Sequence, residues 1–178
     1  LETYLNVEGC KSIIEAVKRC YASLWSERVL VYAKRSGLKT KDAKMAVLVQ
    51  HMVPSRSAGV MFTVSPLSTD GSEFLIESTL GLGEALVSGA ATPDKYVLGR
   101  NGDGTFRMLA KEISIKGKMA RGFKGGVEYN DLDPVEGSRP SITDDQALSL
   151  ATLGEKIEKR MGTPQDIEWA LGDDDQLY

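Results

Sequence analysis

A tight turn between two strand-like stretches constrains the fold more than any other local feature. Residues 101–104 read Asn-Gly-Asp-Gly, which is the composition of a short β-hairpin loop whose central residues take positive φ angles. Residues 95–100 before the turn and 106–115 after it have the character of its two strands. Strands joined by so short a turn run antiparallel and lie side by side. The sequence therefore predicts an antiparallel pair in the middle of the chain.

Further strands are expected on both sides of this hairpin. Apolar, β-branched stretches predict strands over residues 45–53, 58–64, 73–78 and 165–171. Pro66, Asp70 and Gly71 supply turn chemistry between two of them. Residues 172–175 are expected to turn the chain back after the last strand, toward Leu177 and Tyr178.

Helical spacing of apolar residues predicts one amphipathic helix over residues 10–35, ended by Gly37. A glycine loop at 81–83 enters a short helix that Gly89 closes. Thr143 and Gln146 form a capping box for a helix that ends at Gly162. Residues 116–141 show little periodicity and are expected to be an irregular surface segment. Helices and strands do not alternate regularly, which favours an α+β fold with a mixed or antiparallel sheet and flanking helices.

Composition excludes several classes of protein. The chain has 178 residues, 42% of them hydrophobic, which is enough for one core. Its net charge of −3 argues against a surface that coats nucleic acid. Two cysteines, Cys10 and Cys20, make no disulfide scaffold and favour a reducing, cytoplasmic compartment. No apolar run is long enough to predict a membrane span.

The last strand carries the sharpest candidate site. A strand alternates its side chains, so Asp166 and Glu168 share one face while Ile167 and Trp169 occupy the other. Two neighbouring carboxylates are stabilised by a cation between them, and Mg²⁺ bound to substrate phosphates uses one or two carboxylates. A solvated strand face accounts for the same spacing.

Two further stretches suggest phosphate binding. The glycines before Glu84 give the loop at 81–84 backbone N–H groups that suit an anion at a helix start, although short glycine turns are common structural features. The P-loop pattern is absent from the sequence. A basic cluster, Lys111, Lys116, Lys118, Arg121 and Lys124, suits nucleotide phosphates, a docking partner or plain solvation.

His51 is the single histidine, and its apolar surroundings in the sequence favour a structural role over a phosphoryl acceptor or a base. One histidine and two separated cysteines do not make a zinc site. The Gly-x-Ser-x-Gly pattern of a hydrolase elbow is absent too.

Five stretches, in order along the chain, resemble one family. They are residues 47–53 (VLVQHMV), 57–63 (SAGVMFT), 81–89 (GLGEALVSG), 92–96 (TPDKY) and 164–170 (PQDIEWA). Together they resemble the ATP-binding region of phosphoenolpyruvate synthase (pyruvate, water dikinase) and pyruvate phosphate dikinase, to which the rifampin phosphotransferases are related. The resemblance covers essentially the whole chain.

The resemblance implies an ATP-grasp-like fold whose lobes sandwich ATP, and a role for each matching position. Gln50, His51, Met52 and Val53 match the segment that holds the adenine, where His51 is not the phosphorylated histidine. Glu168 matches an acidic residue that binds Mg²⁺ at the phosphates, with Asp166 in support. Glu84 lies in a conspicuous loop of the family and is expected to take part in catalysis.

The resemblance also implies partners. The phosphoryl group passes from ATP to a histidine on a separate domain of the same parent chain and then to pyruvate on a further domain, giving phosphoenolpyruvate, AMP and phosphate. The family's glycine-rich lid and a Gln and an Arg that complete the ATP site are not found here. Residues 1–178 are therefore expected to be a partial ATP-grasp domain, truncated at both ends, which is inactive alone and binds ATP weakly.

Two other functions remain open at this level. An antibiotic kinase of the rifampin phosphotransferase type shares this architecture, and the acceptor is chosen outside these residues. A noncatalytic docking module that kept the fold is the other alternative, against which the retained carboxylates argue.

Overall fold

The computed structural model describes residues 2–37, 43–66, 68 and 71–178. The chain divides into two compact units. The first unit comprises Leu1–Met52 and Gly122–Val127, and the second comprises Val53–Arg121 and Glu128–Tyr178.

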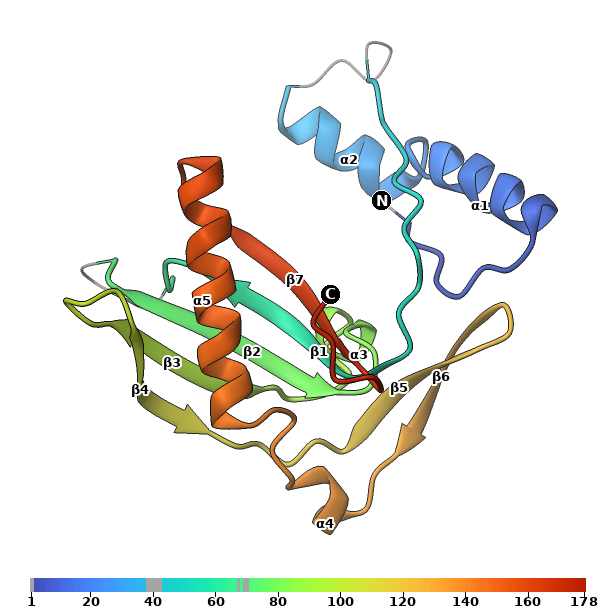
Figure 1. Ribbon diagram of the computed structural model, residues 1–178. Coiled ribbons are helices and arrows are strands. Elements are labelled where there is room, and N and C mark those ends of the chain that lie inside the picture. Colours follow the sequence, from blue (N-terminus) through green and yellow to red (C-terminus); the bar gives the residue numbers. More distant parts are fainter. Residues whose placement is uncertain (1, 38–42, 67, 69–70) are drawn as a thin grey trace. The chain divides into compact units, whose positions relative to one another are not determined.

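The second unit is built on a five-stranded sheet with the order β4-β3-β2-β1-β7 (Figure 1). All four neighbouring pairs run antiparallel. The strands are β1 (Ser55–Phe62), β2 (Glu73–Leu80), β3 (Asp94–Arg100), β4 (Phe106–Glu112) and β7 (Asp166–Gly172). The α+β class and the central hairpin are confirmed. The predicted turn between β1 and β2 includes Asp70, which lies outside the described residues.

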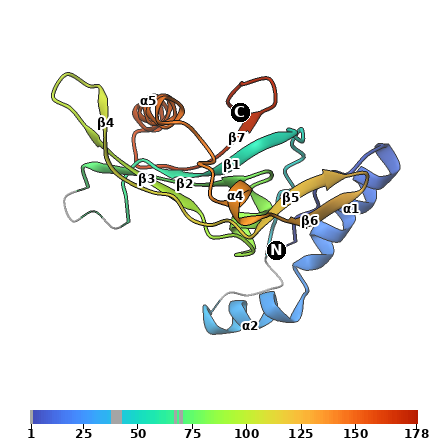
Figure 2. The same ribbon diagram turned by 90° about the horizontal axis from the view of Figure 1, so that it is seen from below.

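One long helix covers one face of this sheet. Helix α5 (Asp144–Met161) lies across the strands on a single side, as the edge-on view of Figure 2 shows. Its Ala147, Leu150 and Ala151 pack with buried strand residues that include Met61, Phe74, Ile76, Tyr96, Leu98, Trp169 and Leu171. The predicted capping box is present: Thr143 accepts a hydrogen bond from the Gln146 N–H, and the Gln146 side chain accepts one from the Thr143 N–H. The helix and its cap are therefore as the sequence predicts.

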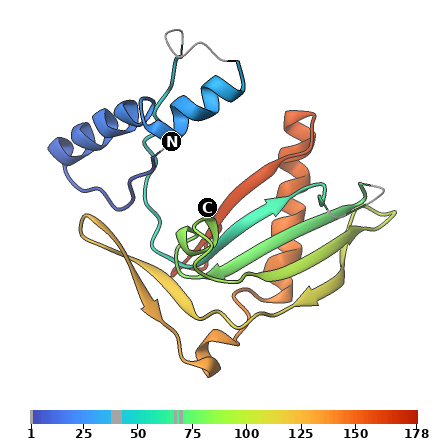
Figure 3. The same ribbon diagram turned by 180° about the vertical axis from the view of Figure 1, so that it is seen from behind.

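The face of the sheet that lies opposite α5, seen in the view from behind (Figure 3), is called here the outer face. By strand register it presents Asp166, Glu168 and Ala170 of β7; Ala58, Val60 and Phe62 of β1; Leu75, Glu77 and Thr79 of β2; Lys95 and Val97 of β3; and Glu112 of β4. A short helix, α3 (Glu84–Val87), lies at one end of this face. The C-terminal turn returns as predicted, because Leu177 bridges back to Leu171.

The prediction of an irregular segment over residues 116–141 is wrong. This stretch forms a hairpin of β5 (Lys118–Phe123) and β6 (Gly126–Asp131), followed by α4 (Pro134–Gly137). Asp133 caps α4 by accepting hydrogen bonds from the N–H groups of Val135 and Glu136. The strands were missed because most of their side chains are exposed, so no apolar alternation marks them.

The first unit holds two helices where one was predicted. Helix α1 (Cys10–Ser23) ends just before the turn at Leu24, and α2 (Glu27–Arg35) begins after Ser26. Ser26 has the extended backbone of an N-cap, which the apolar periodicity does not reveal.

The predicted strand over residues 45–53 is not formed. Residues 43–54 adopt neither helix nor strand. Leu48 is 83% exposed and Val49 is 63% exposed, so the apolar run that suggested a buried strand lacks a sheet to join.

Among the described residues, no helix combines the length and the apolar composition needed to span a membrane.

Candidate functional site

The two predicted carboxylates stand together on the outer face. Glu168 pairs with Val60 of β1, and Asp166 pairs with Phe62. Both acidic residues are exposed, whereas Trp169, which points to the opposite side of β7, is buried in the core. The alternation inferred from the sequence is thus confirmed, and β7 presents two carboxylates side by side to solvent.

Glu168 begins a row of side chains that crosses the sheet, and every member of this row except Val60 is charged. Val60 pairs with Glu77, Glu77 with Lys95, and Lys95 with Glu112. Adjacent strands lie about 4.8 Å apart, so the row extends roughly 19 Å across the five strands. The neighbouring row starts at Asp166 and continues with apolar side chains, Phe62, Leu75 and Val97. The outer face thus sets charged side chains beside an apolar row, in which Leu75 is buried and Phe62 and Val97 are half-buried.

The loop that carries Glu84 lies over the next row of the same face. A Cβ atom placed on Gly83 would lie 3.6 Å from the Ala58 Cβ. Ala58 pairs with Ala170, which is the next outer-face residue of β7 after Glu168. The structure therefore brings the Glu84 loop and Glu168 to adjacent rows of one face.

Backbone contacts fix this loop tightly. The Gly81 N–H donates to the Arg56 carbonyl at 2.8 Å, and the Leu82 N–H donates to the Ala120 carbonyl at 2.9 Å. Gly81 has a φ of +75°, and a Cβ there would lie 2.3 Å from the Ala120 oxygen. Glycine is therefore required at this position. The N–H groups of Gly81 and Leu82 therefore already donate to protein carbonyls, so they are not available to bind an anion as the glycine pattern suggested.

The residues present fit a magnesium ion held jointly with phosphate oxygens. In the described part of the chain, no three or more His, Cys, Asp or Glu side chains are grouped as a metal cage would need. Asp166 and Glu168 supply the one or two carboxylates that Mg²⁺ takes when a substrate provides the remaining oxygens. The donor set is hard oxygen, which is the type that Mg²⁺ prefers.

The predicted adenine segment spans the boundary between the two units. Gln50 and His51 are exposed, and they belong with Met52 to the first unit, whereas Val53 begins the second. His51 does not sit in a buried strand, so the sequence argument for a structural histidine loses its basis.

The lysines of the predicted basic cluster do not form one cationic surface, because three of them pair with different acidic residues. Lys116 is fully buried against Asp94, so it is not available to a ligand. Lys111 pairs with Asp144 at 2.6 Å, and Lys118 lies 3.8 Å from Asp131. The buried pair was missed because Lys116 sits among lysines that look solvated in the sequence.

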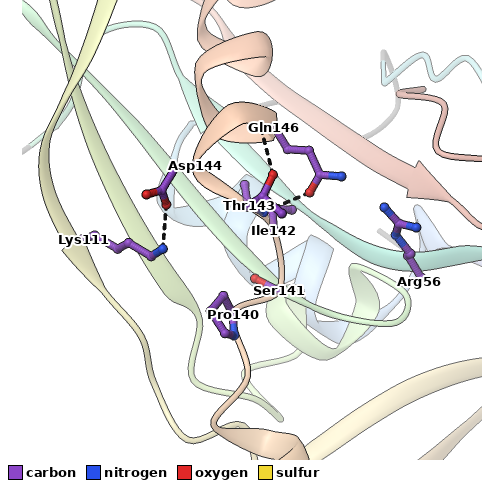
Figure 4. Close-up of a pocket in the computed structure, with 8 residues that line it drawn as sticks. All are labelled: Arg56, Lys111, Pro140, Ser141, Ile142, Thr143, Asp144 and Gln146. Atoms are coloured by element: carbon purple, nitrogen blue, oxygen red, sulfur yellow. Dashed lines mark hydrogen bonds and ion pairs between the residues drawn. The ribbon is translucent and has the colours of Figure 1, made fainter.

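A pocket of about 470 Å³ lies on the other side of the sheet, at the start of α5 (Figure 4). Arg56, Lys111, Pro140, Ser141, Ile142, Thr143, Asp144 and Gln146 line it. Among the predicted candidates it contains Lys111 of the basic cluster, which is turned toward Asp144 (Figure 4), and it contains neither the carboxylates of β7 nor Glu84.

Beneath this region the phenol of Tyr96 is buried and donates to the Ile142 carbonyl at 2.9 Å. Burial, with the negative charge of Asp94 as a second cause, raises the pKa of Tyr96 to about 12. The phenol is therefore neutral at ordinary pH.

Comparison with known proteins identifies the family. Residues 1–178 match the family described as "Pyruvate phosphate dikinase, AMP/ATP-binding domain". The chain is 41% identical over 175 residues to a rifampicin phosphotransferase of Streptomyces sviceus, covering 98% of this chain and 20% of that protein. It is 41% identical over 187 residues to a probable phosphoenolpyruvate synthase of Pyrococcus abyssi and to a phosphoenolpyruvate synthase of Pyrococcus furiosus, in each case covering 99% of this chain and 22% of the relative.

The chain thus spans about a fifth of the length of the curated relatives that it matches. The match to the family runs from the first residue to the last. The resemblance drawn from the five sequence motifs is confirmed: this chain belongs to the family of pyruvate phosphate dikinase AMP/ATP-binding domains.

Proposed function

We propose that this chain is the ATP-binding part of a longer phosphotransferase, of the phosphoenolpyruvate synthase type. A phosphoryl group passes from Mg-ATP to a histidine on another domain and then to pyruvate. The overall reaction consumes ATP, pyruvate and water, and gives phosphoenolpyruvate, AMP and phosphate. The observation that carries the proposal is the family match over residues 1–178, together with phosphoenolpyruvate synthases at 41% identity.

In this proposal the outer face receives the phosphates of ATP. Glu168, supported by Asp166, holds Mg²⁺, and the pairing of both carboxylates on the exposed side of β7 supports that role. The bound ion supplies neutralisation of the charge on the phosphates. Glu84 acts from the adjacent loop, while Gln50, His51, Met52 and Val53 hold the adenine. The domain is a partial ATP-grasp domain of a cytoplasmic enzyme.

The whole reaction belongs to the full-length protein. Phosphoryl transfer depends on positioning by many groups at once, and the matched relatives are about five times as long as this chain. The histidine domain and the pyruvate-binding domain are accordingly assigned to other parts of the parent chain.

Rifampicin is the alternative acceptor, with equal support, because a rifampicin phosphotransferase is also 41% identical. A direct assay separates the two. The full-length protein is incubated with Mg-ATP and either pyruvate or rifampicin, and AMP is measured. AMP formation that requires pyruvate supports the synthase, and formation that requires rifampicin supports the antibiotic kinase. Absence of AMP formation with both pyruvate and rifampicin would leave the docking module as the better account.

The metal role is tested by a pair of matched variants. Glu168→Gln removes one negative charge from β7, whereas Glu112→Gln removes one from β4 at the far end of the same row. We expect AMP formation to fall at least about 100-fold in Glu168→Gln, since metal-assisted charge neutralisation contributes several kcal/mol. Glu112→Gln is expected to keep its activity. Equal activity of both variants would refute the metal role of Glu168.

A further inference from the structure

An ion pair lies wholly inside the second unit, away from the outer face. The Lys116 Nζ atom is 2.6 Å from the Asp94 Oδ1 atom, and both side chains are 0% exposed. Taking two charges out of water is costly unless each finds further hydrogen bonds. A pair this deeply buried therefore requires a complete set of partners.

Asp94 has such a set. Its Oδ1 atom also accepts from the Ser114 N–H at 3.0 Å, and its Oδ2 atom accepts from the N–H and the hydroxyl of Ser141 at 2.8 and 2.7 Å. The Ser141 hydroxyl lies 2.6 Å from the hydroxyl of Ser78 in β2. One carboxylate at the start of β3 thus joins the segment before β5, the loop before α5, and β2.

Hydrogen bonds fix both the side chain and the backbone of Lys116. Its Nζ atom donates to the Ser114 carbonyl at 3.0 Å, and its backbone N–H donates to the Gly137 carbonyl at 3.0 Å. Gly137 approaches so closely that a Cβ there would lie 2.4 Å from the Lys116 oxygen. The backbone at residue 116 is therefore fixed by the ion pair on one side and by α4 on the other.

This fixed point leads directly to the loop of Glu84. Strand β5 begins two residues later, and its buried Ala120 accepts the N–H of Leu82 at 2.9 Å. Ala120 also forms a parallel bridge with Gly81. A displacement of Lys116 would move Ala120, and Ala120 is the backbone support of the turn from which α3 and Glu84 start.

We propose that the Asp94–Lys116 pair positions the glycine loop of residues 81–83 and thereby orients Glu84 over the outer face. Asp94 and Lys116 are positioning residues, because they act through β5 and do not reach the outer face. The loop-positioning part stands on the contacts above, and the effect on catalysis rests on the proposed function of Glu84.

The first test measures the loop itself, by hydrogen exchange in the full-length protein. Lys116→Met removes the buried cation. Lys111→Met is the matched control, because Lys111 also meets a carboxylate at 2.6 Å, that of Asp144, but its pair is partly exposed and makes no link to β5. We expect the Leu82 amide to exchange at least tenfold faster in Lys116→Met and at the wild-type rate in Lys111→Met. Wild-type protection of Leu82 in folded Lys116→Met overturns the proposal.

A second variant covers the case in which Lys116→Met does not fold, since a lone buried charge is strongly destabilising. The double variant Asp94→Asn with Lys116→Met removes both charges and leaves no uncompensated ion. The same tenfold acceleration at Leu82 is expected there, and an unchanged Leu82 rate again overturns the proposal.

The catalytic part is tested by a double-mutant cycle on kcat for AMP formation. If Lys116 acts through Glu84, adding Lys116→Met to Glu84→Gln lowers kcat by less than about twofold beyond Glu84→Gln alone. Multiplying effects would show that Lys116 acts elsewhere. A wild-type protein that forms no AMP would refute the proposed function and the orientation of Glu84 for catalysis, while the Leu82 exchange still decides whether the pair positions the loop.

Discussion

Gly59, in the middle of β1, leaves no room for a side chain. A Cβ atom there would lie 2.0 Å from the Glu77 carbonyl oxygen and 2.9 Å from the Cζ2 atom of Trp169. Since real atoms do not approach so closely, alanine would force β1 away from both neighbours. The glycine is needed for space and not for its backbone angles, because its φ is not positive.

Gly59→Ala is therefore expected to destabilise the protein by about 3 kcal/mol, the upper end of the usual overpacking range. Gly102→Ala is the control, because a Cβ on Gly102 meets nothing within 4 Å and its φ is also not positive. Urea unfolding of both variants measures the difference. A loss of less than about 1 kcal/mol for Gly59→Ala would show that the two strands can separate at little cost.

Tyr96 gives the fold a predictable response to alkaline pH. Its pKa is raised from 10.0 to about 12 in the folded state, chiefly by burial. A raised folded pKa means that the stabilisation is complete below pH 10 and is lost as the pH rises from 10 to 12. The loss from this one residue amounts to about 3 kcal/mol at most.

The variant Tyr96→Phe removes this titration. Below pH 9 we expect it to be less stable than the wild type by about 1–2 kcal/mol, since the hydrogen bond to the Ile142 carbonyl is lost. Between pH 10 and 12 the difference should shrink, because the phenylalanine does not ionise. Unfolding free energies measured across this range test the prediction, and parallel curves for the two proteins would contradict it.

Among the elements, helix α5 shows the strongest agreement between sequence and structure. Its N-cap, its capping-box partner and its terminal glycine are all local signals, and Gly162 takes the left-handed conformation expected of a helix end. Thr143→Ala removes a cap that accepts the Gln146 N–H. We expect a loss of about 1 kcal/mol of unfolding free energy.

Thr152→Ala on the same helix serves as the control. Thr152 is exposed and its hydroxyl bonds only back to the Leu148 carbonyl, so alanine should be neutral or slightly stabilising there. Thermal unfolding of the two variants separates the cap from general helix propensity. An equal change in Tm for both would mean that the capping box contributes no stability of its own.

Elements that depend on distant partners could not be predicted in this way. The apolar run at residues 45–53 has strand composition, but whether it joins a sheet depends on an available edge, and Leu48 stays exposed. Lys116 looks solvated until Asp94, distant in sequence, is seen beside it. For the candidate site, the alternation of side chains along a strand was enough to predict that Asp166 and Glu168 share one face of β7. The row that joins Glu168 to Glu77 needed the register of three strands.

At the scale of the whole molecule, burial is distributed very unevenly between the two units. The core cluster lies entirely in the second unit. Among the described residues of the first unit, only Ser23 and Ala33 are buried, while large apolar side chains such as Trp25 and Tyr32 are exposed. Little apolar area is thus removed from water when α1 and α2 form, and short helices without such burial are marginal.

Hydrogen exchange on the 178-residue chain should therefore show two levels of protection. We expect the amides of α1 and α2 to exchange at least 100-fold faster than those of α5, a helix that buries Leu150 against the sheet. Comparing helix with helix keeps the type of hydrogen bond constant, so the difference reports burial alone. Equal protection of α1 and α5 would show that the two units unfold as one cooperative structure. Faster exchange in α1 and α2 would show that the second unit, which carries Glu84, Asp166 and Glu168, holds its fold by its own core.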